Sequence, residues 1–502
     1  MMSFKNKILR VLTMVIAVMV LLSCAPTYPP PSPIDFTPPD DYVTTIFDID
    51  VQSTASQERL DDSRPNIIFV LTDDQPYQTV AYMPTVENEL IAHGIEFKNG
   101  FVTTPLCCPS RSSILNGEYA HNHQVYTNRM PMGGAPKFND VSTIATWMKD
   151  AGYRTAYYGK YLNGYGDIDP QGYVPPGWDD WGVFLEKNLE YNEDTGSLLY
   201  YFNFSLSENG EIVEYLHSKA NFGADVLTTK AVNFIKESQN EPFFLFVSYY
   251  NPHSPYIAAP RHRETFRQGW NWTPIRSPNT NEKNIGDKPD YLEDFSPLSE
   301  GEIDTATKQI LRSLLSVDDG VASILNALDK TGLSEKTVIV YLTDNGMTLG
   351  NHRFGVSKNC VYEECVKVPF IVYAPAYFSA RIDEHIVANI DLAPTFVDLA
   401  GGSVPDGVNG MSLVPLLKDG NSVWRDDILF EHWPTEEGEG SMVPEFYAVR
   451  TAEWKYVEYE TGEKELYNLV ADPYELVNIA GKKKYEDIQA ELAARLLQLK
   501  GE

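Results

Sequence analysis

The stretch NIIFVLTDD at residues 66–74 sets the pattern of the fold, because a short apolar run ends there directly in two carboxylates. Similar apolar runs occupy residues 243–249 (FFLFVSY) and 338–343 (VIVYLT), and residues 152–158 form a weaker one. Continuous apolar runs of about four to eight residues are typical of strands that are buried on both faces of a mainly parallel sheet. We therefore predict four core strands from these segments.

A helical pattern lies between the predicted strands. In residues 314–328 the apolar side chains recur at steps of three and four, and Gly332 then ends the segment. Alternation of strands with helices of this kind predicts an α/β domain whose sheet carries helices on both faces.

Polar residues follow each predicted strand at the point where it ends. Any one of them alone would be an ordinary cap or turn residue. Because the carboxyl ends of parallel strands share one edge of a sheet, where open α/β folds bind their ligands, these side chains are expected to form one site. Three carboxylates and an amide oxygen in such a place need a cation, and oxygen ligands favour Ca²⁺ over Mg²⁺ or Mn²⁺. The residues are Asp73, Asp74, Lys160, His253, Asp344 and Asn345.

The segment CCPSRSSILNG at residues 107–117 is the most specific motif in the chain. It resembles the C-x-P-S-R…G signature of the type I sulfatases, which are formylglycine-dependent members of the alkaline phosphatase superfamily; Asn116 stands where that family usually has Thr. The resemblance covers about residues 65–480. It implies an alkaline-phosphatase-like sandwich, with a large mixed, mostly parallel sheet flanked by helices and a small C-terminal antiparallel sheet. The plainer alternative makes Cys107 a buried structural thiol.

The resemblance implies that Cys107 is oxidised after synthesis to formylglycine (3-oxoalanine) by a sulfatase-maturing enzyme. A hydrated aldehyde near a divalent cation can lose a proton and attack sulfur in line. The sulfo-enzyme then collapses to the aldehyde and expels sulfate, because the second hydroxyl supplies the electrons. An ordinary serine would need a water molecule to hydrolyse the ester.

The family pattern implies one metal site. By position, Asp73 and Asp74 in the sequence LTDDQ match the first pair of ligands, and Asp344 and Asn345 in TDNG match the second pair. Together with the modified Cys107, they would hold one Ca²⁺.

Three further residues take catalytic roles by resemblance. Arg111 would hold the formylglycine, Lys160 would hold the sulfate, and His253 would protonate the leaving alcohol. Many sulfatases have a histidine two residues after that lysine, but Leu162 and Asn163 follow here. Either that role is missing here, or Asn163 or another histidine fills the place.

The remaining candidates would bind the substrate. Lys358 follows Gly355 with two extra residues between them, where the family usually has Gly-Lys. His123 is expected in the pocket. The other candidates are His121, Glu431 and His432, and for each of them a purely structural role is an equal alternative.

Several stretches resemble the N-acetylglucosamine-6-sulfatase branch. They are the double cysteine at 107–108, HNHQVYTN at 121–128, GKYLNGYG at 159–166 and VPPGWDDW at 174–181. The resemblance implies exo-acting removal of a 6-O-sulfate from an N-acetylglucosamine-type sugar of a sulfated glycan. One alternative is a phosphodiesterase or phosphonate monoester hydrolase of the same superfamily, and the other is a catalytically dead glycan-binding surface protein.

Residues 1–24 have the features of an export signal. A basic leader precedes an apolar run at 11–22, which is shorter than the roughly 20 residues that span a bilayer. The sequence LLSCA at 21–25 resembles a bacterial lipobox, so Cys24 is expected to carry lipid; an ordinary signal peptide is the alternative. Residues 25–63, rich in proline, would be a semi-rigid tether. We therefore expect export to the bacterial cell envelope and a membrane contact through the lipid.

The rest of the chain divides into a catalytic domain at 64–424 and a C-terminal subdomain at 425–502. Strand-like segments and a final helix are predicted in the subdomain, at residues 446–450, 455–459, 465–467 and 484–499. Cys360 and Cys365 can form a disulfide in an oxidising compartment, whereas the adjacent Cys107 and Cys108 need another explanation.

The charge of the chain restricts its partners. Its 40 Lys and Arg residues against 70 Asp and Glu residues give a net charge of −30. A surface of this sign is a poor binder of nucleic acid or anionic lipid, so no nucleic-acid partner is expected. A sulfate site must depend on local cations instead, and long sulfated polymers should bind weakly along the surface.

Overall fold

The computed structural model describes residues 64–168, 170–185, 199–267, 272–420, 422–434 and 442–501. The predicted signal, the lipidated Cys24 and the tether therefore lie outside the described residues. No helix in the described ranges combines the length and the apolar character needed to cross a bilayer.

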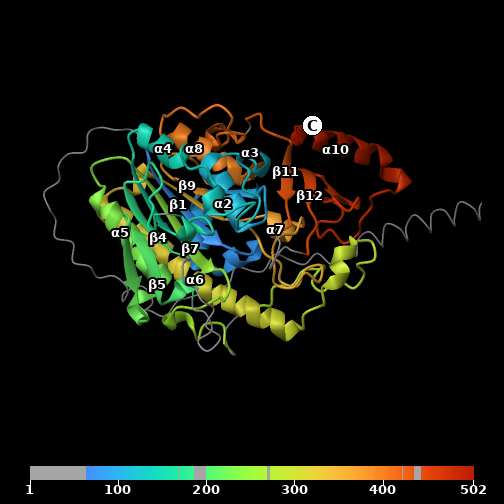
Figure 1. The fold of residues 1–502 in the computed structure, drawn as a ribbon, viewed down its shortest axis with the longest axis horizontal. Coiled ribbons are helices and arrows are strands. Elements are labelled where there is room, and N and C mark those ends of the chain that lie inside the picture. Colours follow the sequence, from blue (N-terminus) through green and yellow to red (C-terminus); the bar gives the residue numbers. More distant parts are fainter. Residues whose placement is uncertain are drawn as a thin grey trace, which may run out of the picture. The chain divides into compact units, whose positions relative to one another are not determined.

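A ten-stranded sheet forms the centre of the fold (Figure 1). Its strand order is β10-β2-β9-β8-β1-β7-β3-β4-β5-β6. In this order the strands are Arg381–Ala388, Ile95–Phe101, Phe370–Tyr373, Thr337–Thr343, Asn66–Asp73, Phe243–Pro252, Arg154–Gly159, Asp180–Phe184, Phe204–Glu208 and Glu211–Tyr215.

The four predicted core strands are β1, β3, β7 and β8, and they lie side by side. β1 pairs in parallel with both β7 and β8, and β7 pairs in parallel with β3. The antiparallel strands β9, β5 and β6 make the sheet mixed. The predicted mixed, mostly parallel sheet is confirmed. The predicted strand 152–158 begins instead at Arg154, because Gly152 adopts φ +81° in the preceding turn.

Alternate residues of β1 enter two different cores. Ile68 and Val70 pack with residues of α5 and α6 on one face, whereas Ile67, Phe69 and Leu71 pack with residues of α4 and α8 on the other. All five side chains are at most 1% exposed, which explains why the run has no polar alternation. Figure 1 shows the two layers of helices. Their bounds are Gly223–Glu237 (α5), Glu300–Thr331 (α6), Ile144–Asp150 (α4) and Leu392–Leu399 (α8).

The predicted helix at 314–328 is the second half of α6, which has 32 residues. Its N-terminus is fixed by a capping box in which Ser299 and Glu302 bond reciprocally to each other's backbone N–H groups. Its end at Gly332, with φ 68°, is the predicted one. Four shorter helices are Cys107–Asn116 (α2), Ala120–His123 (α3), Glu363–Val366 (α7) and Val414–Lys418 (α9).

A four-stranded antiparallel sheet lies near the C-terminus. Its strands are Asp427–His432 (β11), Phe446–Thr451 (β12), Trp454–Tyr459 (β13) and Lys464–Asn468 (β14). The final helix α10, Glu486–Leu499, packs Leu492 and Leu496 against this sheet. The small sheet and the helix were predicted, but β11 was not.

Cys360 and Cys365 form the disulfide that the sequence allowed. The bond joins Cys360, two residues after Lys358, to Cys365 within α7. Both cysteines are fully buried among residues of the C-terminal sheet, including Phe430 and Tyr467. The loop that carries Lys358 is thereby fastened to the small sheet.

Candidate active site

Cys107 is the first residue of α2 and lies at the carboxyl edge of the large sheet. All ten residues of this helix are buried, and Gly117 ends it in the left-handed conformation. The Sγ atom of Cys107 lies 2.8 Å from Nζ of Lys358, 3.6 Å from Oδ1 of Asp73 and 3.9 Å from Oδ1 of Asp74. The signature cysteine therefore meets the strand-end residues, as the sequence predicted.

Three carboxylates converge beside Cys107. One oxygen from each of Asp73, Asp74 and Asp344 lies within 4.8 Å of the others. Asp74 has φ 61°, and its backbone N–H donates to Oδ1 of Asp344 at 3.1 Å. Asn345 donates its Nδ2 to Asp74 at 2.7 Å, while its buried Oδ1 accepts no hydrogen bond from any described residue. An all-oxygen donor set with an unused amide oxygen fits a hard divalent cation.

Each carboxylate also contacts at least one cationic side chain, and Asp73 contacts both Lys160 and Arg111. Lys160 Nζ lies 2.5 Å from Asp73, and Lys358 Nζ lies 2.7 Å from Asp74. Arg111 Nε donates to Asp344 at 2.7 Å. These three cations are the local positive charge that the sequence analysis required of a site for an anion in an acidic protein.

His253 follows β7 and reaches the same cluster. Its Nε2 lies 3.5 Å from Oδ2 of Asp74, and its Nδ1 lies 2.7 Å from the hydroxyl of Tyr250. Burial lowers the pKa of His253 to about 4, against the effect of Asp74; Lys160 and Lys358 lower it further. The imidazole is therefore neutral at pH 7 in this arrangement.

Burial also governs the other titrating groups of the site. Burial and the neighbouring Asp73 raise the pKa of Asp344 to about 6, despite the opposing effect of Arg111. Burial raises the pKa of the Cys107 thiol well above its ordinary value, although Lys160 and Lys358 oppose this. A thiol at this position stays protonated, which makes it a weak nucleophile.

Five predicted substrate-binding residues do not contact the cluster around Cys107 through any described hydrogen bond or ion pair. The buried Oδ1 of Asn163 accepts no hydrogen bond from described residues. His123 holds Ser113 Oγ at 3.1 Å and accepts from the N–H of Val125 at 3.0 Å. One ring nitrogen thus bonds to α2 and the other to the backbone just after α3.

The pair His121 and Glu431 links α3 to β11. Nδ1 of His121 lies 2.6 Å from Oε1 of Glu431, which is fully buried. The carboxylate thus orients His121, whose side chain is 26% exposed, and does not itself face solvent. His432 is also fully buried and stacks on Phe446. Of these three, only His121 lies where a sugar could touch it.

Sequence reasoning missed three residues that support the site. Ser248 Oγ accepts from Arg111 at 2.8 Å, and Tyr250 places its ring 5.6 Å from Nζ of Lys160. Asn128 Oδ1 accepts from the backbone N–H of Cys108 at 2.9 Å, directly at the start of α2. Ser248 and Tyr250 are two positions apart on β7. Their polar atoms at the end of an apolar run could have marked them in the sequence as residues of the site.

The fold is α/β and resembles that of alkaline phosphatase, and the site is built to bind an anionic ester. The sulfatase family model matches residues 65–403, and the model of the N-sulphoglucosamine sulphohydrolase C-terminal region matches residues 350–502. The chain belongs to the sulfatase family and is a sulfuric ester hydrolase. Members of this family generally use formylglycine and a divalent metal ion.

The chain is similar to several named sulfatases. It is 32% identical to N-acetylglucosamine-6-sulfatase of Capra hircus, over 87% of this chain and 83% of that protein. It is 27% identical to N-acetylglucosamine-6-O-sulfatase of Bacteroides thetaiotaomicron, over 90% and 89%. It is 33% identical to the extracellular sulfatase SULF-1 homolog of Drosophila melanogaster, but spans only 33% of that longer protein.

Solved structures share the fold. BT4656 in complex with its substrate D-glucosamine-2-N,6-O-disulfate matches with a TM-score of 0.75 and 25% identity, covering 87% of this chain and 97% of that one. The phosphonate monoester hydrolase of Agrobacterium radiobacter matches with a TM-score of 0.69 and 20% identity, covering 87% and 96%. The second likeness concerns the fold alone.

Proposed function

We propose that this sulfatase removes a 6-O-sulfate from N-acetylglucosamine-type sugars at the ends of sulfated glycan chains. The observation that carries the proposal is the position of Cys107, at the start of α2 between Lys358 and the carboxylates of Asp73 and Asp74. The names of the Capra hircus and Bacteroides thetaiotaomicron relatives, and the glucosamine disulfate bound by BT4656, support the choice of sugar.

The nucleophile is proposed to be formylglycine made from Cys107 by a sulfatase-maturing enzyme. The hydrated aldehyde would supply a hydroxyl that attacks sulfur and a second one that releases sulfate. The burial of Cys107 beside Lys358, Asp73 and Asp74 supports a nucleophile at this position.

The resident metal is proposed to be one Ca²⁺, held by Asp73, Asp74, Asp344 and Asn345 together with the modified Cys107. The ion would offset the charge of the sulfate and acidify the attacking hydroxyl. The free Oδ1 of Asn345 and the three converging carboxylates support a ligand set made of oxygen.

The cationic side chains are proposed to bind the sulfate and to hold the carboxylates in place. Lys160 and Lys358 are proposed to bind the sulfate oxygens, since Lys160 follows β3 and contacts Asp73, and Nζ of Lys358 lies 2.8 Å from Sγ of Cys107. Arg111 fixes Asp344 and Ser248 at the base of the site. Asn163 and His121 are proposed to contact the sugar, and His123, Glu431 and His432 to shape the pocket wall behind them.

His253 is proposed to protonate the leaving alcohol. A bound sulfate ester would bring negative charge close to Nε2 and raise the pKa of the imidazole from its low value. His253→Gln should therefore lower kcat/KM for a sugar sulfate by about 10²- to 10⁴-fold. It should affect 4-nitrophenyl sulfate much less, because nitrophenolate leaves without a proton.

The matched control for this variant is His385→Gln, since His385 is also paired with a buried carboxylate, Asp383, but lies on the edge strand β10. It should leave both rates unchanged. Equal losses for the two substrates in His253→Gln would contradict the role of general acid.

A comparison of esters of one alcohol tests the reaction class. The purified protein should hydrolyse 4-nitrophenyl sulfate at least ten times faster than 4-nitrophenyl phosphate or phenylphosphonate. Faster turnover of the phosphorus esters would favour the phosphonate hydrolase alternative. A panel of defined N-acetylglucosamine sulfates should show release from the 6-position, and release only from other positions would overturn the proposed sugar.

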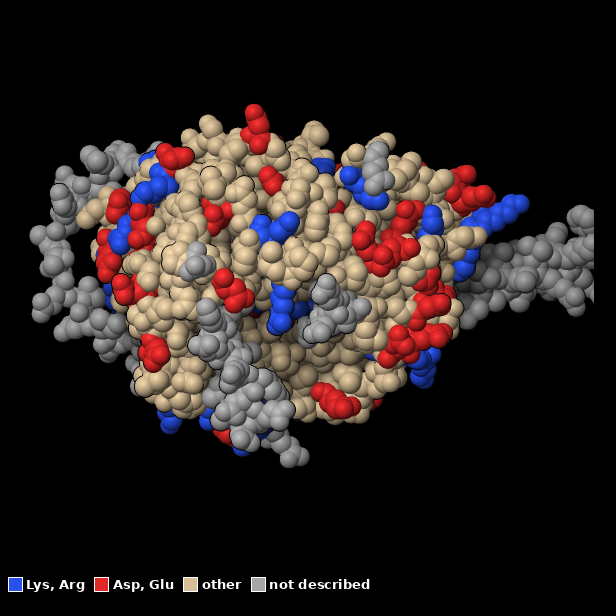
Figure 2. All heavy atoms as spheres, in the orientation of Figure 1, with Lys and Arg blue, Asp and Glu red and all other residues tan. Residues whose placement is uncertain are grey.

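The surface charge favours short substrates over long ones. Figure 2 shows acidic side chains spread over the visible face and gathered at its right-hand end, where Figure 1 shows the C-terminal sheet. Such a surface repels a long polyanion at low salt, so chain ends that reach the local cations should react best. Activity that rises with polymer length at low ionic strength would contradict this.

The protein is proposed to act after export, anchored to a bacterial membrane through lipid on Cys24. The basic leader, the short apolar run and the lipobox-like LLSCA support this location. A lipid-bearing N-terminal peptide starting at Cys24 would be the expected product in the native host.

A further inference from the structure

A buried cluster of metal-ligating side chains lies outside the active site. His352, Glu364 and Glu475 each place one ligand atom within 4.8 Å of the other two. The three residues are 0%, 9% and 1% exposed. They come from the loop after β8, from α7 and from the segment after β14, so distant parts of the sequence meet here. The proposed sulfatase chemistry uses none of them.

The orientation of His352 is fixed as it is in metal-binding histidines. Its Nδ1 donates to Oε2 of Glu282 at 2.6 Å, and its ring stacks on Tyr362 at a centroid distance of 4.0 Å. Metal-ligating histidines usually donate their other ring N–H to a carboxylate in this way. The opposite nitrogen, Nε2, is thereby directed towards Oε2 of Glu364 at 4.0 Å.

Glu364 supplies the second observation that points to a ligand. Its Oε1 accepts from Asn279 at 2.8 Å and from Asn351 at 3.1 Å, but its buried Oε2 accepts no hydrogen bond within the described ranges. A separation of 4.0 Å from the histidine is too long for a hydrogen bond. An ion about 2.1 Å from each atom could bridge this separation, at an angle wider than tetrahedral.

Two neighbouring contacts are compatible with an ion at this position. Nδ2 of Asn279 lies 2.9 Å from Nε2 of His352, and it would keep its bond to Glu364 when an ion takes the ring nitrogen. Nζ of Lys455 lies 2.7 Å from Glu475 and 2.9 Å from Glu363, so one ammonium serves two carboxylates. Glu475 thus shares this ammonium with Glu363.

We propose that His352, Glu364 and Glu475 form a second metal site, which takes a divalent transition-metal ion such as Zn²⁺ or Mn²⁺. One imidazole nitrogen and two carboxylate oxygens suit these ions, whereas Ca²⁺ prefers oxygen ligands alone. The ion would fasten the loop between Asn345 and Lys358 to the C-terminal region. The site is therefore structural, and its proposal does not depend on the sugar that the enzyme desulfates.

Metal content and thermal stability test the proposal on the whole purified protein. With Ca²⁺ present in excess to keep the active site filled, the wild-type protein is equilibrated with Zn²⁺ or Mn²⁺ and then freed of unbound ion. Elemental mass spectrometry should find one transition-metal ion per chain. His352→Gln and Glu364→Gln should hold none, and the addition of Zn²⁺ should raise Tm by about 5 °C in the wild type but in neither variant.

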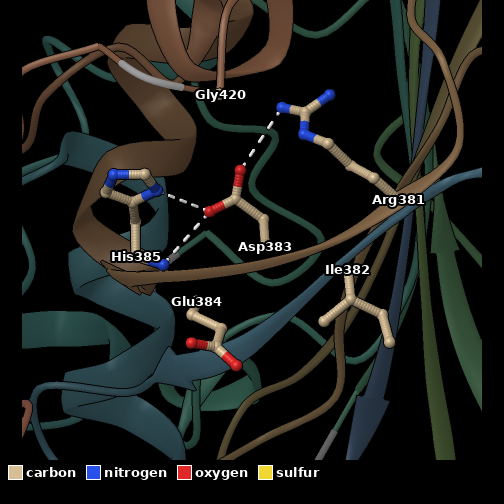
Figure 3. A pocket seen from close by; sticks show the side chains of 6 residues that line it. All are labelled: Arg381, Ile382, Asp383, Glu384, His385 and Gly420. Atoms are coloured by element: carbon tan, nitrogen blue, oxygen red, sulfur yellow. Dashed lines mark hydrogen bonds and ion pairs between the residues drawn. The ribbon is translucent and has the colours of Figure 1, made fainter.

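His385→Gln is the matched control. Figure 3 shows that His385 makes the same contact, with Nδ1 2.6 Å from Oδ1 of Asp383, while Arg381 takes the other carboxylate oxygen at 3.3 Å. The carboxylate of this pair contacts an arginine, whereas in the proposed site the histidine lies near a second carboxylate. This variant should keep the full complement of bound ion.

The alternative to a bound metal ion is that protons neutralise the carboxylates of this cluster. Burial raises the pKa of Glu282 and of Glu364 to about 7, so both carboxyls can hold a proton near neutral pH. Wild-type protein without Zn²⁺ or Mn²⁺ after equilibration would establish that arrangement and overturn the metal site. Variants that still bind as much ion as the wild type would overturn it as well. Glu364→Gln is isosteric, so its folding should survive even if His352→Gln does not fold.

Discussion

Cys107→Ala should lower the rate of sulfate ester hydrolysis by about 10⁵-fold or more, which is the scale of loss when a covalent nucleophile is removed. The residue lies at the only point where α2, Lys358 and the carboxylates of Asp73 and Asp74 meet through described contacts. No hydroxyl or thiol elsewhere in that contact set could replace it. Rates with 4-nitrophenyl sulfate and with a sugar 6-sulfate should fall together.

The fold should survive this substitution, because alanine fits the first turn of α2 and only one sulfur atom is lost. Tm should therefore change by a few degrees at most, as for a small core truncation. The control is Cys108→Ala, which removes the neighbouring thiol from the core beside Ile114 and Leu115. It should keep wild-type kcat, whereas a comparable loss of activity in Cys108→Ala would contradict the assignment of the nucleophile.

Mass spectrometry adds an independent measurement. The peptide that contains Cys107 and Arg111 should carry an aldehyde in protein from the native host. An unmodified thiol there, in protein that nevertheless turns over, would remove formylglycine from the mechanism. An unmodified thiol in inactive protein would instead favour the glycan-binding alternative.

The central sheet could be predicted because its signal is local. The strands β1, β7 and β8 are buried on both faces, so each appears in the sequence as one apolar run bounded by polar residues. Their common direction then placed Asp73, Asp344 and the segment after β7 at one edge. The first half of α6 was not predicted, because its residues are less regularly apolar and its start depends on the capping box at Ser299.

The charged residues around Cys107 could also be predicted from the sequence, whereas the contacts of the substrate-binding candidates could not. Asp74, Arg111 and Lys358 were assigned from motifs whose spacing the chemistry constrains. Residues such as His123 and Glu431 have no such constraint. Whether a histidine after a helix faces a pocket or hydrogen-bonds to that helix depends on tertiary packing, here on Ser113 Oγ and Val125 N–H.

The −30 charge and the sulfate site are compatible because of burial. Lys160, Lys358 and Arg111 are at most 3% exposed, so solvent and salt screen them far less than the acidic surface. Each is paired with at least one carboxylate of the cluster, and Arg111 with both Asp344 and Asp73. A metal ion that took up those carboxylates would leave Lys160 and Lys358 available to an anion, which links metal binding to sulfate binding.

Removal of the divalent ion should consequently abolish turnover. Treatment with EGTA followed by dialysis should lower kcat/KM by about 10³-fold, equivalent to about 4 kcal/mol of transition-state stabilisation. Ca²⁺ should restore the rate more fully than Mg²⁺, because the converging carboxylates of Asp73, Asp74 and Asp344 with the free Oδ1 of Asn345 offer the oxygen ligands that Ca²⁺ accepts in larger number.

Asp344→Asn should show a similar loss that added Ca²⁺ does not repair, because the variant lacks a charged ligand and loses the shorter of the two carboxylate contacts of Arg111. The matched control is Asp391→Asn, which breaks another buried pair, Arg425 with Asp391 at 2.6 Å, away from the carboxylate cluster. Both variants should lose stability, but only Asp344→Asn should lose kcat/KM in the protein that remains folded. Full activity in wild-type protein shown by elemental mass spectrometry to hold no divalent ion would contradict the metal site, and equal losses in the two variants would attribute the effect to stability alone.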